Sequence, residues 1–376
     1  MKKQMKIEKI KSIEFFNRES EKEEILNILR AEPRLITFIY GPINSGKTSL
    51  ITNLIENLPD DHVVIYINLR ERIISTYKDF VEAIFDVKHE GLLSKIIRKL
   101  KKQQDIIYDA TSTLGKTHGI PIPKSVFDGI FREEKPKDAF VYILNIIKDI
   151  KSKGKTPIFI IDELQKIGDV KVDNYLIYDV FNFFIRLTKE LHLCHVFALS
   201  SDSLFIERVY GEAVLQERCE YLLIDDFDSA TAKKFLEKYG FNNEEQQIAL
   251  NYFGGKPIHL TGIIDVKARG GDIKKKFRKN IKKRKGEIRQ KLYYIKNIGK
   301  DITFGEATIK LSHNRIIEVM KIFKNNEIME YKAITPEIAY LTSENVIFVD
   351  PMNTIIKPQS KIDLTAIREV LEELET

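Results

Sequence analysis

Short apolar runs alternate along the first 226 residues with longer segments in which apolar residues recur every three or four positions. The short runs have the length and composition of buried parallel strands. We expect strands at 35–40, 62–69, 157–162, 194–200 and 221–225. The longer segments have the periodicity of helices that cover a sheet. We expect helices at 48–57, 137–151 and 172–191. This alternation predicts a three-layer α/β core built around four or five parallel strands.

Two stretches depart from the simple alternation. Residues 70–100 have helical periodicity, whereas residues 101–136 mix proline, glycine and charge. We therefore predict an insertion of loops and short helices at about 84–136. Near the N-terminus, Ser20 and Glu23 have the spacing of a capping box, which predicts a helix that starts near Ser20.

After residue 226 the pattern becomes mostly helical. Three short amphipathic segments at 227–268 predict a small helical lid, and residues 274–291 keep one apolar stripe that predicts a long helix. We expect a helix at 313–325, strands near 331–341 and 345–350, and a tail helix at 361–375. Helices with a short hairpin are typical of a winged-helix module. The predicted organisation is a core at 1–226, a lid at 227–268, and a basic helix with a winged-helix-like module at 269–376.

The first predicted strand leads directly into the motif G-x-x-x-x-G-K-[ST], which here spans 41–48 and is followed by a helix. The glycines let the backbone turn and approach an anion, and successive N–H groups with the helix N-terminus can bind phosphate. Lys47 is expected at the β- and γ-phosphates and Thr48 at Mg²⁺. The predicted nucleotide contacts are Gly41, Pro42, Ile43, Asn44, Ser45, Gly46, Lys47, Thr48 and Ser49.

A second acidic signature closes the strand PIFIID at 157–162. Asp162 is a candidate to hold Mg²⁺ through water or through Thr48. Glu163 is placed to orient or deprotonate an attacking water. The strand at 194–200 ends in Ser200 and Ser201, where a hydroxyl could sense the γ-phosphate, although a serine turn explains the pair almost as well. Arg208 and Arg218 follow, and either could be a solvated charge or an arginine finger.

Composition and charge narrow the class of protein. A hydrophobic content of 43% with 31% charged residues suits a globular chain. The N-terminal MKKQMKIEKIKSIEFF is too charged for a signal segment, and no apolar run reaches the length of a membrane span. The cysteines are only Cys194 and Cys219, which favours a reducing cytoplasm. Eleven Lys and Arg with one acid, Glu287, fill 274–291, so DNA is a candidate partner.

Several motifs together resemble the archaeal ATPase family, within the AAA+/STAND group of P-loop NTPases. They are FFNRESE at 15–21, GPINSGKTSL at 41–50, PIFIIDELQKI at 157–167, the Ser-Ser strand end, GGKP at 254–257 and VDP at 349–351. The resemblance implies a RecA-like core, a helical lid and a C-terminal winged helix.

The resemblance also implies roles for individual residues. Lys47 and Thr48 would contact the phosphates, and Thr48 and Asp162 would hold Mg²⁺. Glu163 would activate water, and Ser201 or Ser200 would sense the nucleotide. Pro257 would contact the nucleotide base, and Arg18 would lie near the adenine. The chain departs from the family pattern at Lys256 within GKP, at Leu199 and Ser200, and in lacking a clear sensor arginine. These departures leave the turnover rate open.

Two hypotheses for function follow, and they are compatible. In the first, the protein is a slow ATPase that hydrolyses ATP to ADP and phosphate with Mg²⁺ and acts as a nucleotide-dependent switch on a protein client or in an oligomer, with Arg218 as a candidate catalytic residue. In the second, it is a DNA-binding regulator with nucleotide as a ligand and little turnover. A small-molecule kinase, a transporter ATPase and a GTPase are disfavoured, because no acceptor motif, L-S-G-G-Q or N-K-x-D segment is present.

Overall fold

The computed structural model describes residues 13–88, 120–124, 127–128, 136–172, 174–304 and 307–375. The chain divides into two compact units. The core unit comprises Arg18–Gly41 and Lys47–Ile224, and the C-terminal unit comprises Met1–Asn17, Pro42–Gly46 and Asp225–Thr376. The predicted boundary at 268 lies inside the C-terminal unit and stays a prediction.

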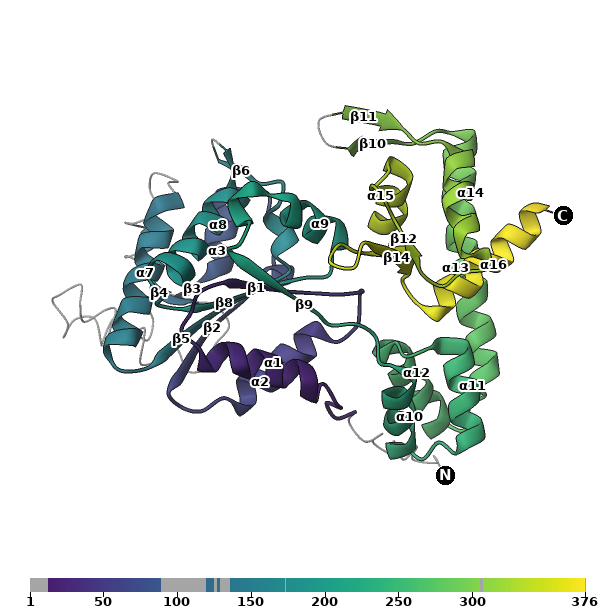
Figure 1. Ribbon diagram of the computed structural model, residues 1–376, viewed down its shortest axis with the longest axis horizontal. Helices are drawn as coiled ribbons and strands as arrows, with labels where there is room; N and C mark the ends of the chain where they lie inside the picture. Colours follow the sequence, from purple (N-terminus) through teal and green to yellow (C-terminus); the bar gives the residue numbers. More distant parts are fainter. Residues whose placement is uncertain are drawn as a thin grey trace, which may run out of the picture. The chain divides into compact units, whose positions relative to one another are not determined.

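A five-stranded parallel sheet forms the centre of the core unit (Figure 1), in the order β2-β5-β8-β1-β9. Its strands are β1 (Ile36–Tyr40), β2 (His62–Asn68), β5 (Thr156–Asp162), β8 (His195–Ser200) and β9 (Cys219–Leu223). All residues of β1 and β8 are buried, because both strands have neighbours on each side and helices over their faces. The predicted α/β class, with a parallel sheet at its centre, is confirmed.

Helices cover both faces of this sheet, with α1 and α2 below it and α8 and α9 above it in Figure 1. Their bounds are α1 (Glu19–Arg30), α2 (Lys47–Asn57), α3 (Tyr77–Ile84), α7 (Pro136–Ser152), α8 (Leu176–Ile185) and α9 (Ser203–Gly211). A π-helical segment, Arg186–Glu190, continues α8. The helices expected at 48–57 and 137–151 are thus confirmed within a residue or two.

Two local predictions in the core are wrong, and a third is confirmed for a different reason. The segment after Ile84 is a strand, β3 (Phe85–Lys88), which pairs in parallel with β4 (Ile120–Pro123); most of the predicted insertion lies outside the described residues. A small antiparallel pair, β6 (Lys171–Val172) and β7 (Asn174–Tyr175), delays α8 to Leu176. The helix predicted to start near Ser20 is confirmed as α1, which begins at Glu19, but Ser20 hydrogen-bonds Glu21 and does not cap the helix.

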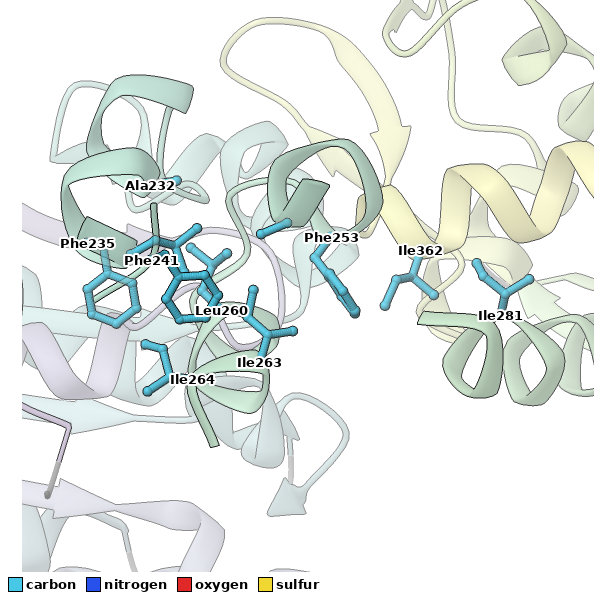
Figure 2. Close-up of a cluster of buried hydrophobic side chains, with 11 residues drawn as sticks. Ala232, Phe235, Phe241, Phe253, Leu260, Ile263, Ile264, Ile281 and Ile362 are labelled. Carbon is cyan, nitrogen blue, oxygen red and sulfur yellow. The ribbon is translucent and has the colours of Figure 1, made fainter. Parts of the chain in front are cut away.

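The three predicted lid helices are present in the C-terminal unit as α10 (Ser229–Lys238), α11 (Asn243–Phe253) and α12 (Pro257–Ala268). Side-chain caps at Asp228 and Asn242 fix the starts of α10 and α11. Their apolar faces meet in one cluster, which Ile281 and Ile362 extend toward the rest of the unit (Figure 2). The cluster therefore joins the lid helices to the helices that follow.

One long helix, α13 (Ile273–Asn297), follows the lid and confirms the helix predicted at 274–291. Asp272 caps its start by accepting a hydrogen bond from the Lys274 N–H. The rest of the unit contains the hairpin β10 (Asp301–Phe304) and β11 (Ala307–Lys310), α14 (His313–Lys321), α15 (Pro336–Ser343) and α16 (Lys361–Glu375). A three-stranded sheet has the order β12 (Met329–Glu330), β14 (Ile355–Pro358), β13 (Ile347–Asp350).

The strand predicted near 331–341 is wrong, since this stretch contains α15. Thr335 caps the helix and Pro336 occupies its first turn, where its missing N–H costs nothing. The tail helix at 361–375 is confirmed, and the strand near 345–350 is β13. The winged-helix description of this region stays a prediction. Among the described residues no helix combines the length and apolar character needed to span a membrane.

Candidate functional site

The glycine-rich loop leaves the C-terminal end of β1, the strand second from the β9 edge of the sheet. Gly41 has φ 153°, and a Cβ at this position would lie 2.1 Å from the carbonyl oxygen of Ile224. Gly46 has φ 102° and Asn44 has φ 61°, both in the left-handed region. The loop therefore needs glycine at both motif positions, which is the physical reason for the spacing seen in the sequence.

Lys47 is the first residue of α2 and its side chain is buried. Its Nζ donates a hydrogen bond to the Gly41 carbonyl oxygen at 2.9 Å. The ammonium thus folds back over the loop that it follows, where phosphate oxygens would offer stronger acceptors than a carbonyl. Ser49, two residues on, is exposed on α2.

Thr48 and Asp162 meet at the carboxyl edge of the sheet. The Thr48 hydroxyl donates to Asp162 Oδ2 at 2.8 Å, and the Tyr66 hydroxyl donates to the same oxygen at 3.1 Å. Burial and the neighbouring Asp162 carboxylate raise the pKa of Tyr66, so that tyrosine stays a donor. Hydroxyl and carboxylate oxygens are donors that Mg²⁺ accepts, so the residues present fit this metal.

Glu163 follows Asp162 in a left-handed conformation, with φ 63° and ψ 41°. Its carboxylate is buried and both of its oxygens are engaged. Oε1 pairs with the Arg70 guanidinium, and Oε2 accepts a hydrogen bond from Gln165 Nε2 at 2.7 Å. The carboxylate is therefore oriented by groups from two different strand ends.

The two serines at the end of β8 have different environments. Ser200 is buried, donates to Gln165 Oε1 at 2.9 Å and accepts from the Asp202 N–H at 3.1 Å. A chain of hydrogen bonds thus links Ser200 to Glu163 through Gln165. Ser201, the residue that the sequence favoured, is half-buried next to this chain.

Sequence reasoning missed Tyr66, Arg70 and Gln165. Tyr66 and Arg70 lie in β2 and just after it, and β2 pairs with β5 so that Asn68 stands opposite Asp162. Strand order brings them to the acidic pair, and sequence spacing carries no sign of that order. Gln165 stood in the D-E-L-Q motif, but its contact depends on the turn geometry at Glu163.

The two candidate finger arginines are placed differently in the core unit. Arg218 precedes β9, and Cys219 of β9 pairs with Ile36 at the start of β1. Arg218 therefore lies at the N-terminal ends of these strands, whereas the loop follows the C-terminal end of β1. Its guanidinium donates to the Val214 carbonyl at 2.9 Å. Arg208 is exposed over the Phe205 ring, and its guanidinium lies next to Gly168, at the end of the turn that carries Glu163 and Gln165.

Arg18 and Pro257 have clear structural roles. Arg18 has φ 81° at the start of α1, and its buried guanidinium pairs with Glu21 at 2.7 Å. Pro257 occupies the first turn of α12 in the C-terminal unit. The structure does not test their predicted contacts with a nucleotide base.

A glycine-rich loop after β1 and an acidic pair after β5, on a five-stranded parallel sheet, define a P-loop NTPase fold. The family "ATPase domain predominantly from Archaea" matches residues 15–263. The chain belongs to this archaeal ATPase family. Residues 274–371 match a second family, "Uncharacterized ATP-binding protein MJ1010-like, C-terminal domain".

Full-length relatives support this assignment. An uncharacterized ATP-binding protein of Methanocaldococcus jannaschii is 46% identical over 376 residues, covering 98% of this chain and all of that protein. One from Pyrococcus abyssi is 41% identical over 361 residues, covering 96% of this chain and all of that protein. In solved structures, a Walker-type ATPase of Pyrococcus abyssi matches with a TM-score of 0.59 at 15% identity, covering 94% of this chain and 96% of that one, and shows the same fold.

Proposed function

We propose that this protein binds ATP with Mg²⁺, hydrolyses it slowly to ADP and phosphate, and acts as a nucleotide-dependent molecular switch. The observation that carries the proposal is the hydrogen bond between Thr48 and Asp162, next to Glu163. Phosphate binding, metal binding and water activation then have candidate groups at one edge of one sheet. The preference for ATP rests on the family and on the names of the relatives.

Nucleotide binding is assigned to the loop 41–46 and the first turn of α2. Backbone N–H groups in this loop and at the helix N-terminus favour the β- and γ-phosphates electrostatically. Lys47 would exchange the Gly41 carbonyl for phosphate oxygens, a charge-assisted interaction that is stronger than the one it replaces. Contacts of Arg18 and Pro257 with the adenine ring of the nucleotide stay proposals.

Thr48 and Asp162 are the residues that would hold Mg²⁺. When bound, the metal would neutralise charge on the phosphate oxygens. The protein's part is to keep a hydroxyl and a carboxylate oxygen together, and the Tyr66 hydroxyl donates to the same Asp162 oxygen as Thr48 does. Such second contacts orient metal ligands in many proteins.

Glu163 is the proposed base that orients the attacking water and accepts its proton. Arg70 and Gln165 already donate to its two oxygens, so a water has to share an oxygen with one of these donors or displace it before Glu163 can polarise it. This requirement supports slow turnover and gives a point at which a partner could accelerate it. Ser200, through Gln165, and Ser201 are proposed to sense the γ-phosphate edge of the site.

Glu163→Gln tests the proposal most directly. The variant should keep ATP affinity and lose turnover by about 10²- to 10⁴-fold, because a general base serves only the reaction. Lys166→Gln, an exposed neighbour on the same turn, is the matched control and should keep wild-type turnover. Equal turnover in the wild type and Glu163→Gln would place the base elsewhere.

A DNA-binding regulator with little turnover is the second candidate function, favoured by the exposed cations of α13. In either case a partner must respond to the nucleotide state of the protein. We propose that this partner is DNA, a protein client or another copy of the chain. In another copy, Arg218 is the candidate arginine finger. The free thiols Cys194 and Cys219 support a cytoplasmic location.

A further inference from the structure

The eleven cations at 274–291 of α13 do not form one continuous surface. In the C-terminal half of this segment the cations pair with acids of the same unit. Arg284 pairs with Asp363 and with Glu287 at 2.8 Å, and Lys285 pairs with Glu369 at 2.8 Å and Glu373 at 2.7 Å. Arg289 pairs with Glu373, and Lys291 pairs with Glu344.

In these pairs, acidic side chains of the same unit neutralise the positive charge of α13. Asp363, Glu369 and Glu373 all lie on α16, the helix that packs along α13. Hydrogen bonds with Glu369 and Glu373 raise the pKa of Lys285, and those with Arg289 and Lys285 lower the pKa of Glu373. This half of the helix is therefore neutralised by the protein itself and has little net attraction for an external anion.

The N-terminal half is different. Six cations at 274–282 have no ion pair with any residue that the structure describes, and five of them are exposed, with Lys276 half-buried. They are Lys274, Lys275, Lys276, Arg278, Lys279 and Lys282. We call this set the free half of α13. The nearby Lys283 is exposed and lies 3.8 Å from Glu287, a weak surface pair.

Three lysines of the free half lie on one face of the helix. Lys275, Lys279 and Lys282 follow the spacing i, i+4, i+7, and Gly286 continues the same stripe at i+11. The three lysines span about 10 Å along the helix axis. Gly286 is exposed in the middle of the helix, and a Cβ there would meet nothing within 4 Å. No contact with a residue that the structure describes explains this glycine, which weakens a helix interior and leaves the backbone open to close approach.

We propose that the free half of α13 binds the phosphate backbone of duplex DNA. Duplex DNA carries one negative charge per about 1.7 Å of axis, so a stripe of this length faces several phosphates at once. Six unpaired cations repel one another, and a dense polyanion relieves that repulsion. The contact is with the backbone, so it positions the protein without reading sequence. The proposal does not depend on ATP hydrolysis.

The environment of the helix argues against other partners. A membrane-bound amphipathic helix exposes its apolar face to lipid, but here Ile281, Ile288, Leu292 and Ile295 are buried in the unit. Single-stranded nucleic acid binds largely by stacking on exposed aromatic rings. The aromatic residue of the free half, Phe277, already stacks on Tyr252 with ring centroids 4.3 Å apart.

The test compares two triple variants with the same net charge, in the full-length protein. The first neutralises the free stripe with Lys275→Gln, Lys279→Gln and Lys282→Gln. The second neutralises three paired cations with Lys285→Gln, Arg289→Gln and Lys291→Gln. Fluorescence anisotropy with a mixed-sequence DNA duplex, titrated at several salt concentrations, measures affinity and its salt dependence. Arms with duplex RNA and with vesicles of anionic lipid use the same proteins.

The free-stripe variant should bind duplex DNA at least about tenfold more weakly at low salt, and its log affinity should depend on log salt with a slope smaller by about 2.7. The paired-half variant should bind nearly as well as the wild type. Equal losses in both variants, or no wild-type binding at low salt, would overturn the proposal. Tighter binding to duplex RNA or to vesicles, lost in the free-stripe variant, would also overturn it by assigning the surface to that partner.

Discussion

The hydroxyl of Thr48 and Oδ2 of Asp162 lie 2.8 Å apart, although 114 positions separate them in the chain. The contact joins the first turn of α2 to the end of β5. Because β8 lies between β1 and β5, the contact exists only through the strand order of the sheet. The glycine motif is a strong signal by itself and the acidic strand end is a weak one, and the contact makes them one candidate site.

Lys47→Ala should remove the stabilisation that nucleotide gives. With ATP·Mg²⁺ at a hundredfold its dissociation constant, binding adds about 2.7 kcal/mol to the stability of the wild type. We expect a rise in melting temperature for the wild type and none for the variant, measured by differential scanning fluorimetry. Lys148→Ala, at an exposed position on α7, is the control and should shift as the wild type does. A full shift in Lys47→Ala would refute the assigned phosphate contact.

Thr48→Ala and Asp162→Asn should weaken the Mg²⁺ dependence of nucleotide binding. Each change removes one of the oxygen donors, so more Mg²⁺ is needed to reach half of the maximal ATP affinity, by about tenfold. Thr48→Ser keeps the hydroxyl and should behave as the wild type. The measurement is ATP affinity by isothermal titration calorimetry across a Mg²⁺ series, and unchanged Mg²⁺ curves in both variants would exclude these ligands.

Arg70→Ala should increase the turnover rate several-fold. The change removes the donor on Oε1 of Glu163, so water no longer shares that oxygen with the guanidinium. The readout is steady-state phosphate release, with ATP affinity measured alongside. Arg72→Ala, at a neighbouring exposed arginine, is the matched control. A fall in turnover in Arg70→Ala would instead give Arg70 a direct part in the reaction.

His195 should make the core unit sensitive to acid. Burial in β8, with smaller contributions from Lys151 and His62, lowers the pKa of His195 to about 4. The unfolded chain titrates near 6.5 and binds the proton first, so stability falls as pH drops from about 6.5 to about 4. A buried neutral imidazole of this kind accounts for at most about 3 kcal/mol.

His195→Gln removes this titration and should flatten the pH dependence of stability within that window. Chemical denaturation at a series of pH values measures it. The half-buried His313, changed to Gln, is the control and should leave the slope as in the wild type. An unchanged slope in His195→Gln would show that another group dominates the acid response.

Much of the core could be predicted because its physics is local. A parallel strand covered on both faces reads as a continuous apolar run, and the glycine motif encodes its own turn geometry, as Gly41 shows. The strand prediction for 331–341 was wrong because the apolar residues there fit both strand and helix periodicity. Thr335 and Pro336 are helix start signals, and they decide in favour of the helix.

The site could be predicted only in part, because its remaining contacts depend on which strands are neighbours. Arg70 reaches Glu163 because β2 pairs with β5. Ser200, rather than Ser201, reaches Gln165 because of the direction in which β8 ends. The charge run at 274–291 reads as uniform in sequence, yet acids about 80 positions later neutralise one half of it.

The ion pairs between α13 and α16 have a consequence for heat. The cost of removing charged groups from water falls as temperature rises, so networks such as Lys285, Arg289 and Glu373 contribute more stability in hot solution than in cold. The unpaired lysines of 274–282 gain nothing in this way. Warming therefore strengthens the ion pairs that hold the second half of α13 against α16. The first half keeps its charges available to an anionic partner at every temperature at which the unit stays folded.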